Sequence, residues 1–410
     1  LENSKPLFGL PFTLKDLYPL VGHKVTFGLT WKKDNIETVN CSWVDKLISK
    51  GAIPLGLTNV PETGLHWDTY NYVYGKTINP YDSRRNTAGS SGGEGAIMAA
   101  QGTCVSIGSD AGGSIRMPSA CCGLFGLKPT ALAVKSSPAY LVSGYRESIH
   151  CIGPMARHAC DLKFIFENLC DDDVLPRLRL DVPVDLKKLR VFVMNELRST
   201  KIEGLHEEPR AALRKAVNHL QSDYGITPTP VDFARINHGG NLFFGVFDLG
   251  NPKYERLETA MEPREWNVVS EIGKALIGKS EHMLGVLMQV FIEKYLYSEK
   301  NNKYYQHEAD LLRSELAATL GDDGVMFMPT MAHLALYHGQ ADWKIFNISY
   351  TCFANVIGFP AIAIPMGIDK KSGLPTSVQV VASPHNERLL IAIANEFEQA
   401  FGGFIPPGSV

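Results

Sequence analysis

Residues 89–118 read GSSGGEGAIMAAQGTCVSIGSDAGGSIRMP. This stretch contains two serine- and glycine-rich knots, at residues 89–95 and 108–114, around a predicted buried helix (96–100) and a predicted buried strand (104–107). Glycine loses more conformational entropy than other residues in regular structure, so its concentration between core elements needs a reason. One reason is a glycine-rich turn beside a tightly packed sheet. The other, which we favour, is a set of backbone N–H groups turned toward a ligand or a developing charge, next to a serine nucleophile.

The bulk composition excludes several classes of protein. With 410 residues, of which 45% are hydrophobic, the chain can bury a large core. Its formal net charge of −3, without any basic run, argues against nucleic acid as a partner. The eight cysteines show neither CxxC nor paired Cys/His spacing, so we expect core thiols in a reducing compartment and no metal site.

The start of the chain and its apolar runs bear on localisation. The chain begins at Leu1 without a visible signal peptide, and we expect a part of the protein, with any membrane anchor, to precede it. No apolar run reaches the length of a membrane span. We therefore expect an intracellular protein that is either cytoplasmic or associated with a membrane surface.

The order of the predicted elements favours a layered α/β fold. A strand at residues 7–14 ends at Lys15, a helix follows at 37–50, and another strand follows at 52–58. Further strands are predicted at 124–130, 189–194, 325–328, 360–366 and 377–381, and further helices at 158–169, 208–220 and 386–400. Because there is no internal repeat or low-complexity linker, residues 1–410 are predicted to form one domain.

The segment from residue 233 to residue 300 is the hardest to interpret. Residues 271–297 have helical spacing, and residues 283–292 are nearly all apolar. This run is too short to cross a bilayer. It could be a buried helix, the lining of a lipid-shaped pocket, or a patch that contacts a membrane surface.

Three serine-hydrolase mechanisms compete for the two knots. Ser91 fits GxSxG formally, but a nucleophile elbow must follow a buried strand, and residues 81–88 are polar. A Ser–His–Asp triad cannot be located from sequence. A lysine base must be neutral, and Lys15, at the end of an apolar strand, suits that role because desolvation disfavours the ammonium form. The phosphate-binding pattern GxxxxGK[ST] is absent.

Three motifs together resemble the amidase signature enzymes. They are Lys15 in GLPFTLKD, Ser90 in GSSGGEGA and Ser114 in GSDAGGSIRMPSACCGLFGLKP, and the 24-residue spacing of the two serines also agrees with that family. The resemblance covers about residues 9–129 and resumes at 346–404, while 131–344 match weakly. Within the family, NPYDSRRNTAGSSGGEGA and FGGFIPPG look most like the fatty acid amide hydrolases of the second type. Ala88 stands where many members have Gly, and Ala111 where many have a larger residue.

The resemblance implies a large fold with a twisted mixed sheet covered by helices, and a Ser–Ser–Lys triad. In it, Ser114 is the nucleophile, Ser90 the bridging serine and Lys15 the base. The oxyanion hole is expected from backbone N–H groups of Ala111, Gly112, Gly113 and Ser114. Ser91 is expected to support either the backbone or Lys15. Asp110 and Arg116 are expected to hold the loop as a structural pair. No metal or organic cofactor is implied.

The implied reaction is hydrolysis of a linear amide, through an acyl-enzyme, to an acid and an amine. The expected partner is a small amide substrate with a lipid-like acyl chain, and not nucleic acid; a homodimer and membrane-surface association stay open. An apolar substrate channel is predicted from residues at helical spacing: Met283, Leu284, Leu287, Met288 and Phe291. The alternatives are the amidase component of a tRNA-dependent amidotransferase, which would need partner proteins, and a non-catalytic binding protein on the same fold.

Overall fold

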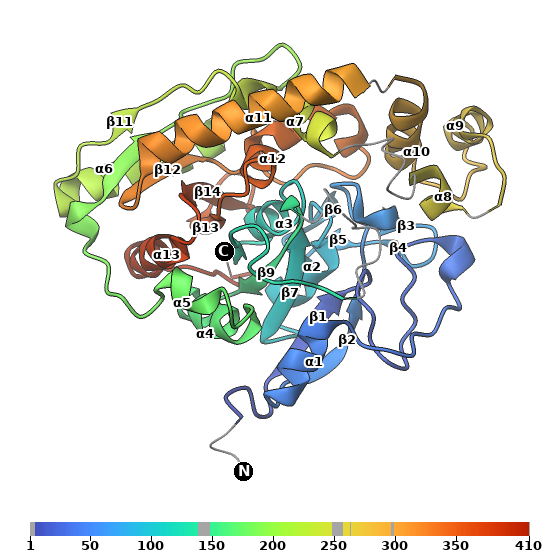
Figure 1. The fold of residues 1–410 in the computed structure, drawn as a ribbon, viewed down its shortest axis with the longest axis horizontal. Coiled ribbons are helices and arrows are strands. Elements are labelled where there is room, and N and C mark those ends of the chain that lie inside the picture. Colours follow the sequence, from blue (N-terminus) through green and yellow to red (C-terminus); the bar gives the residue numbers. More distant parts are fainter. Residues whose placement is uncertain (1–4, 138–147, 248–256, 263, 297–298, 410) are drawn as a thin grey trace.

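The computed structural model describes residues 5–137, 148–247, 257–262, 264–296 and 299–409 (Figure 1). At its centre lies a ten-stranded sheet in the order β11-β10-β12-β14-β13-β8-β9-β7-β1-β2. The strands are β1 (Pro11–Lys15), β2 (Ile53–Thr58), β7 (Val105–Asp110), β8 (Phe125–Lys128), β9 (Cys151–Ala156), β10 (Arg190–Val193), β11 (Thr229–Pro230), β12 (Gly324–Pro329), β13 (Ala361–Ile368) and β14 (Pro375–Ala382). Two small hairpins pair β3 (Tyr70–Asn71) with β4 (Gly75–Lys76), and β5 (Ile78–Asn79) with β6 (Asp82–Asn86).

The sheet is parallel at both ends and antiparallel in the middle. At one end β1 pairs in parallel with β2 and with β7, and at the other β10 pairs in parallel with β11 and with β12. Between these ends, β9, β8, β13 and β14 make antiparallel pairs. The prediction of a mixed α/β sheet is therefore confirmed.

Helices cover both faces of the sheet. They are α1 (Ser42–Ser49), α2 (Gly92–Ala99), α3 (Arg116–Cys121), α4 (Ala159–Leu169), α5 (Leu175–Leu178), α6 (Glu207–Tyr224), α7 (Gly239–Val246), α8 (Leu257–Met261), α9 (Val268–Leu276), α10 (Leu284–Phe291), α11 (Glu299–Leu320), α12 (Ser349–Val356) and α13 (Glu387–Phe401). None of the helices in these described ranges is both long and apolar enough to cross a bilayer.

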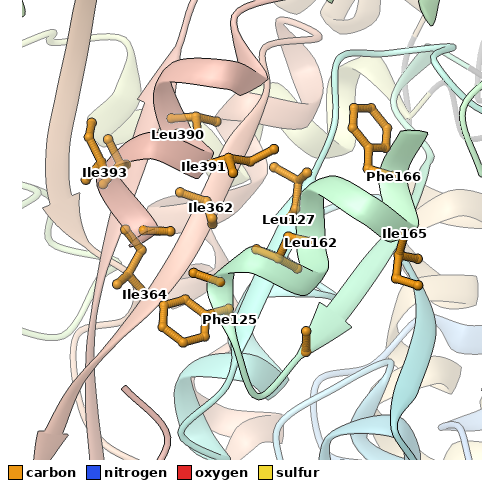
Figure 2. Close-up of a cluster of buried hydrophobic side chains, with 14 of the residues drawn as sticks. Phe125, Leu127, Leu162, Ile165, Phe166, Ile362, Ile364, Leu390, Ile391 and Ile393 are labelled. Carbon is orange, nitrogen blue, oxygen red and sulfur yellow. The ribbon is translucent and has the colours of Figure 1, made fainter. Parts of the chain in front are cut away.

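Alternate residues of the same strand belong to different hydrophobic cores. In β13, Ile362 and Ile364 belong to the core that helices α1, α4, α6 and α13 also line, and the close-up shows part of this core (Figure 2). Their neighbour Ala361 packs on the opposite side with α7, α11 and α12. Because both faces are covered, these strands are apolar throughout instead of alternating. Each fully buried Ile or Leu contributes about 1.5–3 kcal/mol relative to an exposed one.

Two predicted elements differ from the structure. The prediction of one continuous helix over 271–297 is wrong: α9 ends at Leu276, Gly278 has φ +69°, and α10 begins only at Leu284. The sequence predicts no strand at residues 151–156, yet they form β9. Its sequence CIGPMA contains Gly and Pro, which weaken the sequence signal for an interior strand.

Parallel pairing places the two motif regions at one edge of the sheet. Lys15 is the last residue of β1, and Asp110 is the last residue of the adjacent β7. The second knot therefore leaves the sheet beside the end of β1. The first knot leads into α2, and its Ser91 N–H donates to the Ser114 carbonyl at 3.1 Å.

Candidate active site

Lys15 is fully buried and contacts two serines. Its Nζ lies 2.8 Å from Ser90 Oγ, 2.9 Å from Ser109 Oγ and 3.4 Å from the Ser109 carbonyl oxygen. Burial lowers the pKa of Lys15 to about 7, against the opposing charges of Asp110 and Glu94. Lys15 is therefore not a solvated surface lysine, and a substantial fraction of the amine is neutral at neutral pH.

The two motif serines line the same cavity, which has a volume of about 270 Å³. Both Ser90 and Ser114 line it, although 24 residues separate them in the chain. The remaining wall is largely apolar and comes from several elements: Leu17, Phe27, Leu65, Leu132, Val134, Ile149, Ile152, Phe247, Leu257 and Ala260. Its polar side chains are Tyr18, Thr63, Ser109, Lys135, Ser136 and His150. An apolar pocket with few polar groups beside two serines is the form expected of a small-molecule site.

Asp110 and Arg116 form an ion pair without exposed side-chain surface, at 2.9 Å. Burial opposes ionisation of Asp110, but the Arg116 guanidinium, together with Lys128 and the Ile115 N–H, holds the pKa of this carboxyl well below its usual range. Asp110 also accepts the N–H groups of Gly113, at 2.6 Å, and Ile115, at 3.1 Å. The ionised carboxylate thus shapes the turn that carries Ser114.

Two amide side chains from the C-terminal half of the chain hydrogen-bond the Asp110–Arg116 pair. Arg116 donates to Asn355 Oδ1 at 2.6 Å and to Gln379 Oε1 at 2.5 Å. Asn355 Nδ2 in turn donates to the Asp110 carbonyl at 2.7 Å. These two amides were not predicted, because no local motif marks a residue whose partner lies more than 200 positions away.

Both glycine-rich knots contain positions at which a Cβ would clash with a neighbour. A Cβ on Gly92 would lie 2.3 Å from Thr69 Oγ1, and one on Gly93 would lie 2.5 Å from the Asn59 backbone, so these glycines let α2 pack closely. Gly113 has φ +127°, and a Cβ there would lie 2.2 Å from Thr351 Oγ1.

The predicted oxyanion donors differ in their surroundings. The N–H of Gly113 is already donated to Asp110. Ala111 and Ser114 line the cavity directly. Gly112 lies between Ala111 and Gly113, and its carbonyl accepts the Thr351 hydroxyl at 2.6 Å. The backbone N–H groups of Ala111, Gly112 and Ser114 stay predicted donors to the reacting oxygen. The Gly113 N–H could join them only if its hydrogen bond to Asp110 were broken.

Two further buried residues, Ser109 and Glu94, were not predicted as site residues. Ser91 Oγ, expected to support the backbone or Lys15, donates to the Ser109 carbonyl at 3.2 Å, and Ser109 itself contacts Lys15. Glu94, in the first knot, accepts the Thr13 hydroxyl at 2.5 Å and the Thr58 hydroxyl at 2.6 Å. Burial raises the pKa of Glu94. The sequence marks Glu94 only as an acidic residue within a motif of small, mostly apolar residues, GSSGGEGA.

The predicted channel helix lies behind the cavity wall. Met283 and Leu287 have no exposed surface and share a hydrophobic cluster with Phe27 and Leu257, which themselves line the cavity. Phe291 packs on the same cluster, Leu284 is half-buried, and Met288 is 42% exposed. None of these five residues is in the described lining of the cavity. Met283, Leu287 and Phe291 pack behind its wall, and a substrate channel at this helix stays a prediction.

Comparison with known proteins identifies the family to which this chain belongs. The profile of the Amidase family matches residues 2–391. The chain belongs to this family, the amidase signature enzymes, and is an amide-hydrolysing enzyme.

Two groups of relatives match almost the whole chain. It is 32% identical to fatty-acid amide hydrolase 2 of Homo sapiens, a match covering 100% of this chain and 78% of that protein. It is 28% identical to a component of the glutamyl-tRNA(Gln) amidotransferase of Methanosarcina barkeri, over 97% of this chain and 86% of that protein. Among solved structures, 6-aminohexanoate cyclic dimer hydrolase shares the fold, with a TM-score of 0.81, 22% identity and coverage of 99% of this chain and 88% of that one.

Proposed function

We propose that this enzyme hydrolyses long-chain fatty acid amides with Ser114 as nucleophile, Ser90 as bridge and Lys15 as base. The observation that carries the mechanism is the buried Lys15, 2.8 Å from a serine that shares a cavity with Ser114. The substrate class is supported by the apolar cavity wall and by the similarity to the human hydrolase.

In the first half of the reaction, Ser114 Oγ attacks the amide carbonyl carbon. Its proton passes to Ser90 Oγ while the Ser90 proton passes to neutral Lys15 Nζ, because a serine hydroxyl is a poor nucleophile until a base removes its proton. The carbonyl oxygen takes the electron pair of the broken π bond. Backbone N–H groups at Ala111, Gly112 and Ser114 are proposed to stabilise this oxyanion.

Collapse of the tetrahedral intermediate breaks the C–N bond. The proton returns from Lys15 through Ser90 to the leaving nitrogen, so that a neutral amine departs instead of an amide anion. The acyl group stays on Ser114 Oγ. Water then attacks this ester by the same relay and releases the carboxylic acid.

A second, smaller cavity of about 50 Å³ suggests a separate place for each of the two parts of the substrate. Gly64, Leu65, Ala111 and Ser114 line both cavities, so Ser114 lies where the two meet. The smaller one has aromatic walls from Trp67, Phe243 and Phe244. We assign the acyl chain to the larger cavity, where each buried CH₂ contributes about 0.8 kcal/mol, and the amine to the smaller one.

The amidotransferase alternative has support from the match to the Methanosarcina barkeri protein. That function requires partner proteins, so the isolated chain would then release little free acid from fatty amides. Ammonia release from glutamine that appears only when those partners are added would favour it.

Activity-based labelling tests the proposal. The wild-type chain is incubated with a fluorophosphonate probe, digested, and mapped by mass spectrometry. We expect the label on Ser114, and hydrolysis of a long-chain primary fatty amide by the same preparation. A label on another serine contradicts the mechanism, and a labelled enzyme that cleaves only short amides contradicts the substrate class.

Homodimer formation and access to substrate from a membrane surface belong to the same proposal. Long-chain amides partition into lipid, which would favour a peripheral enzyme. Sedimentation of the purified chain with and without lipid vesicles tests both, and a monomer absent from the vesicle fraction contradicts both.

A further inference from the structure

Residues 62–65 form a short strip beside Ser114, and the backbone of this strip is strained. Gly64 and Leu65 line both cavities. Thr63, which lines the larger cavity, has φ 58° and ψ 4°, a left-handed conformation that is rare for a β-branched residue. Such a conformation costs free energy and persists only where the surrounding structure holds it. Contacts from elsewhere in the chain must therefore keep the strip in this shape.

One side of the strip is held by the loop that follows β1. The Thr63 N–H donates to the Phe27 carbonyl at 2.7 Å. Phe27 itself lines the larger cavity and has φ 57°, so two left-handed residues meet there. The N–H of Thr26, the residue before it, donates to the buried Asp16 carboxylate at 2.7 Å. Because Asp16 directly follows Lys15, the strip is tied to the end of the strand that carries the proposed base.

The other side of the strip is held by the N-terminal end of α10. Glu62 is 1% exposed, and its Oε1 lies 2.5 Å from His282 Nδ1. Its Oε2 accepts the N–H of Met283 at 2.8 Å, and Met283 immediately precedes α10. Trp266 stacks on the His282 ring, with the ring centroids 5.2 Å apart. Glu62 thus fastens the strip to the start of this helix through both of its carboxylate oxygens.

A second contact from the same helix fixes the other end of the strip. Gln289, which lines the smaller cavity, donates from Nε2 to the Leu65 carbonyl at 2.5 Å. Gly285 lets the helix approach closely, because a Cβ there would lie 2.5 Å from His66 Nε2. The helix therefore contacts the strip at both of its ends, Glu62 and Leu65.

We propose that α10 keeps the two cavities separate by holding the strip between them, with Glu62 as the main positioning residue. The inference rests on the proposed division of the substrate between the two cavities. A backbone that lines both cavities is a partition between the acyl chain and the leaving amine, and it keeps the smaller cavity closed to bulky amines. If the strip relaxes, Thr63 leaves its left-handed conformation and the two spaces merge beside Ser114. The enzyme then loses its preference for amides with a small leaving amine.

Three variants of the full chain test the proposal. Glu62→Met removes both hydrogen bonds of the carboxylate at a similar side-chain length. Glu62→Gln keeps both, because its amide oxygen accepts the Met283 N–H and its amide N–H donates to His282 Nδ1 when the histidine proton is on Nε2. Val290→Ala is the matched control, because it removes buried methyl groups from the same helix at a side chain that cannot hydrogen-bond the strip.

The first measurement is amide hydrogen exchange of the peptide that contains residues 62–65, followed by mass spectrometry. We expect this peptide to exchange about tenfold faster in Glu62→Met than in the wild type, because the hydrogen bond from Thr63 to Phe27 opens more often. Glu62→Gln and Val290→Ala should exchange like the wild type here. Unchanged exchange in Glu62→Met would overturn the proposal, and so would equally fast exchange in Val290→Ala.

The second measurement is selectivity for the leaving amine. The kcat/KM of a long-chain primary fatty amide is divided by the kcat/KM of the N-benzyl amide of the same acid. We expect this ratio to fall about tenfold in Glu62→Met and to stay unchanged in Glu62→Gln and Val290→Ala. Melting temperatures are measured on the same samples. An equal loss on both amides in Glu62→Met would make Glu62 a structural residue only and overturn its positioning role.

Failure of the proposed function is distinguishable from failure of this inference. If the wild type cleaves neither amide, or if the fluorophosphonate does not label Ser114, the proposed function fails, and hydrogen exchange alone decides whether α10 holds the strip. If the wild type cleaves both amides with equal efficiency, the proposed function stands and the partition is contradicted.

Discussion

At the scale of single residues, Lys15 shows how burial produces a base. In water a lysine is protonated below about pH 10.4, and an ammonium cannot accept a proton from Ser90. The end of β1 removes Lys15 from solvent and surrounds it with hydroxyl groups instead of a carboxylate partner. The cost of desolvating the charge then favours the neutral amine.

Removing the nucleophile should abolish turnover without affecting the fold. We expect Ser114→Ala to lower kcat on the order of 10⁶-fold, as for other activated serines. Steady-state hydrolysis is measured beside the melting temperature, which should not change. Turnover like that of the wild type would end the assignment of Ser114.

The lysine should make activity and stability respond to pH in linked ways. Its pKa is about 7 in the fold, so kcat should fall about tenfold per pH unit below that value as the amine is protonated. The unfolded chain has the higher pKa, so between about pH 7 and 10.4 it binds more protons than the folded chain, and this residue makes stability rise with pH there.

Lys15→Met tests that linkage. The variant should be inactive, yet more stable to urea than the wild type at neutral pH, and the difference should shrink as the pH rises toward about 10. Urea midpoints at several pH values provide the measurement. A Lys15→Met enzyme with normal kcat would make Lys15 structural only, and a variant less stable than the wild type at every pH would contradict the burial cost.

At the scale of elements, the turn after β7 is held by an ion pair that joins distant parts of the chain. Asp110 ends β7, Arg116 begins α3, and Asn355 on α12 contacts both. Buried charges are tolerated only when paired and hydrogen-bonded, and this pair satisfies both conditions. The element that carries Ser114 is therefore held in place by α12, which packs against it.

Breaking this pair should destabilise the fold far more than breaking an exposed one. Arg116→Met leaves the Asp110 charge unpaired and should cost about 3–5 kcal/mol in the free energy of unfolding. The matched control is Arg84→Met, whose ion pair with Asp82 is largely exposed on the arginine side, so its loss should leave the free energy of unfolding nearly unchanged. Equal effects of the two substitutions on urea unfolding would contradict this account.

At the scale of the whole molecule, the cavity is assembled from segments that lie far apart in the chain, from Leu17 to Ala260. Lys15 ends β1 and Ser114 lies in the turn after β7, while Leu257 at the start of α8 packs with Phe27 and with residues of α10 (Figure 1). One domain over the whole chain stays our prediction. The proposed acyl-binding wall is thus a property of the assembled molecule and not of one segment.

Two residues of similar exposure test which surface binds the acyl chain. Leu132 is 44% exposed and lines the cavity, whereas Met288 is 42% exposed and does not. Leu132→Asp should lower kcat/KM for long acyl amides about tenfold or more and leave short ones nearly unchanged, because a carboxylate meets the buried chain. Met288→Asp should affect neither chain length. A selective loss in Met288→Asp would favour a substrate channel at α10.

The sequence by itself determined the candidate reacting groups and the family. Lys15, Ser90 and Ser114 stand in contiguous motifs whose residue types are dictated by local chemistry, and the buried strands are visible as apolar runs. Only the tertiary structure decided which surfaces meet. It placed His150 on Tyr18 across 132 positions, brought Asn355 onto Asp110, and put Met283 and Leu287 behind the wall instead of in it. The physical reason is that an apolar side chain or an amide satisfies many environments equally well, so its partner is selected by how helices and strands pack and not by the residues beside it.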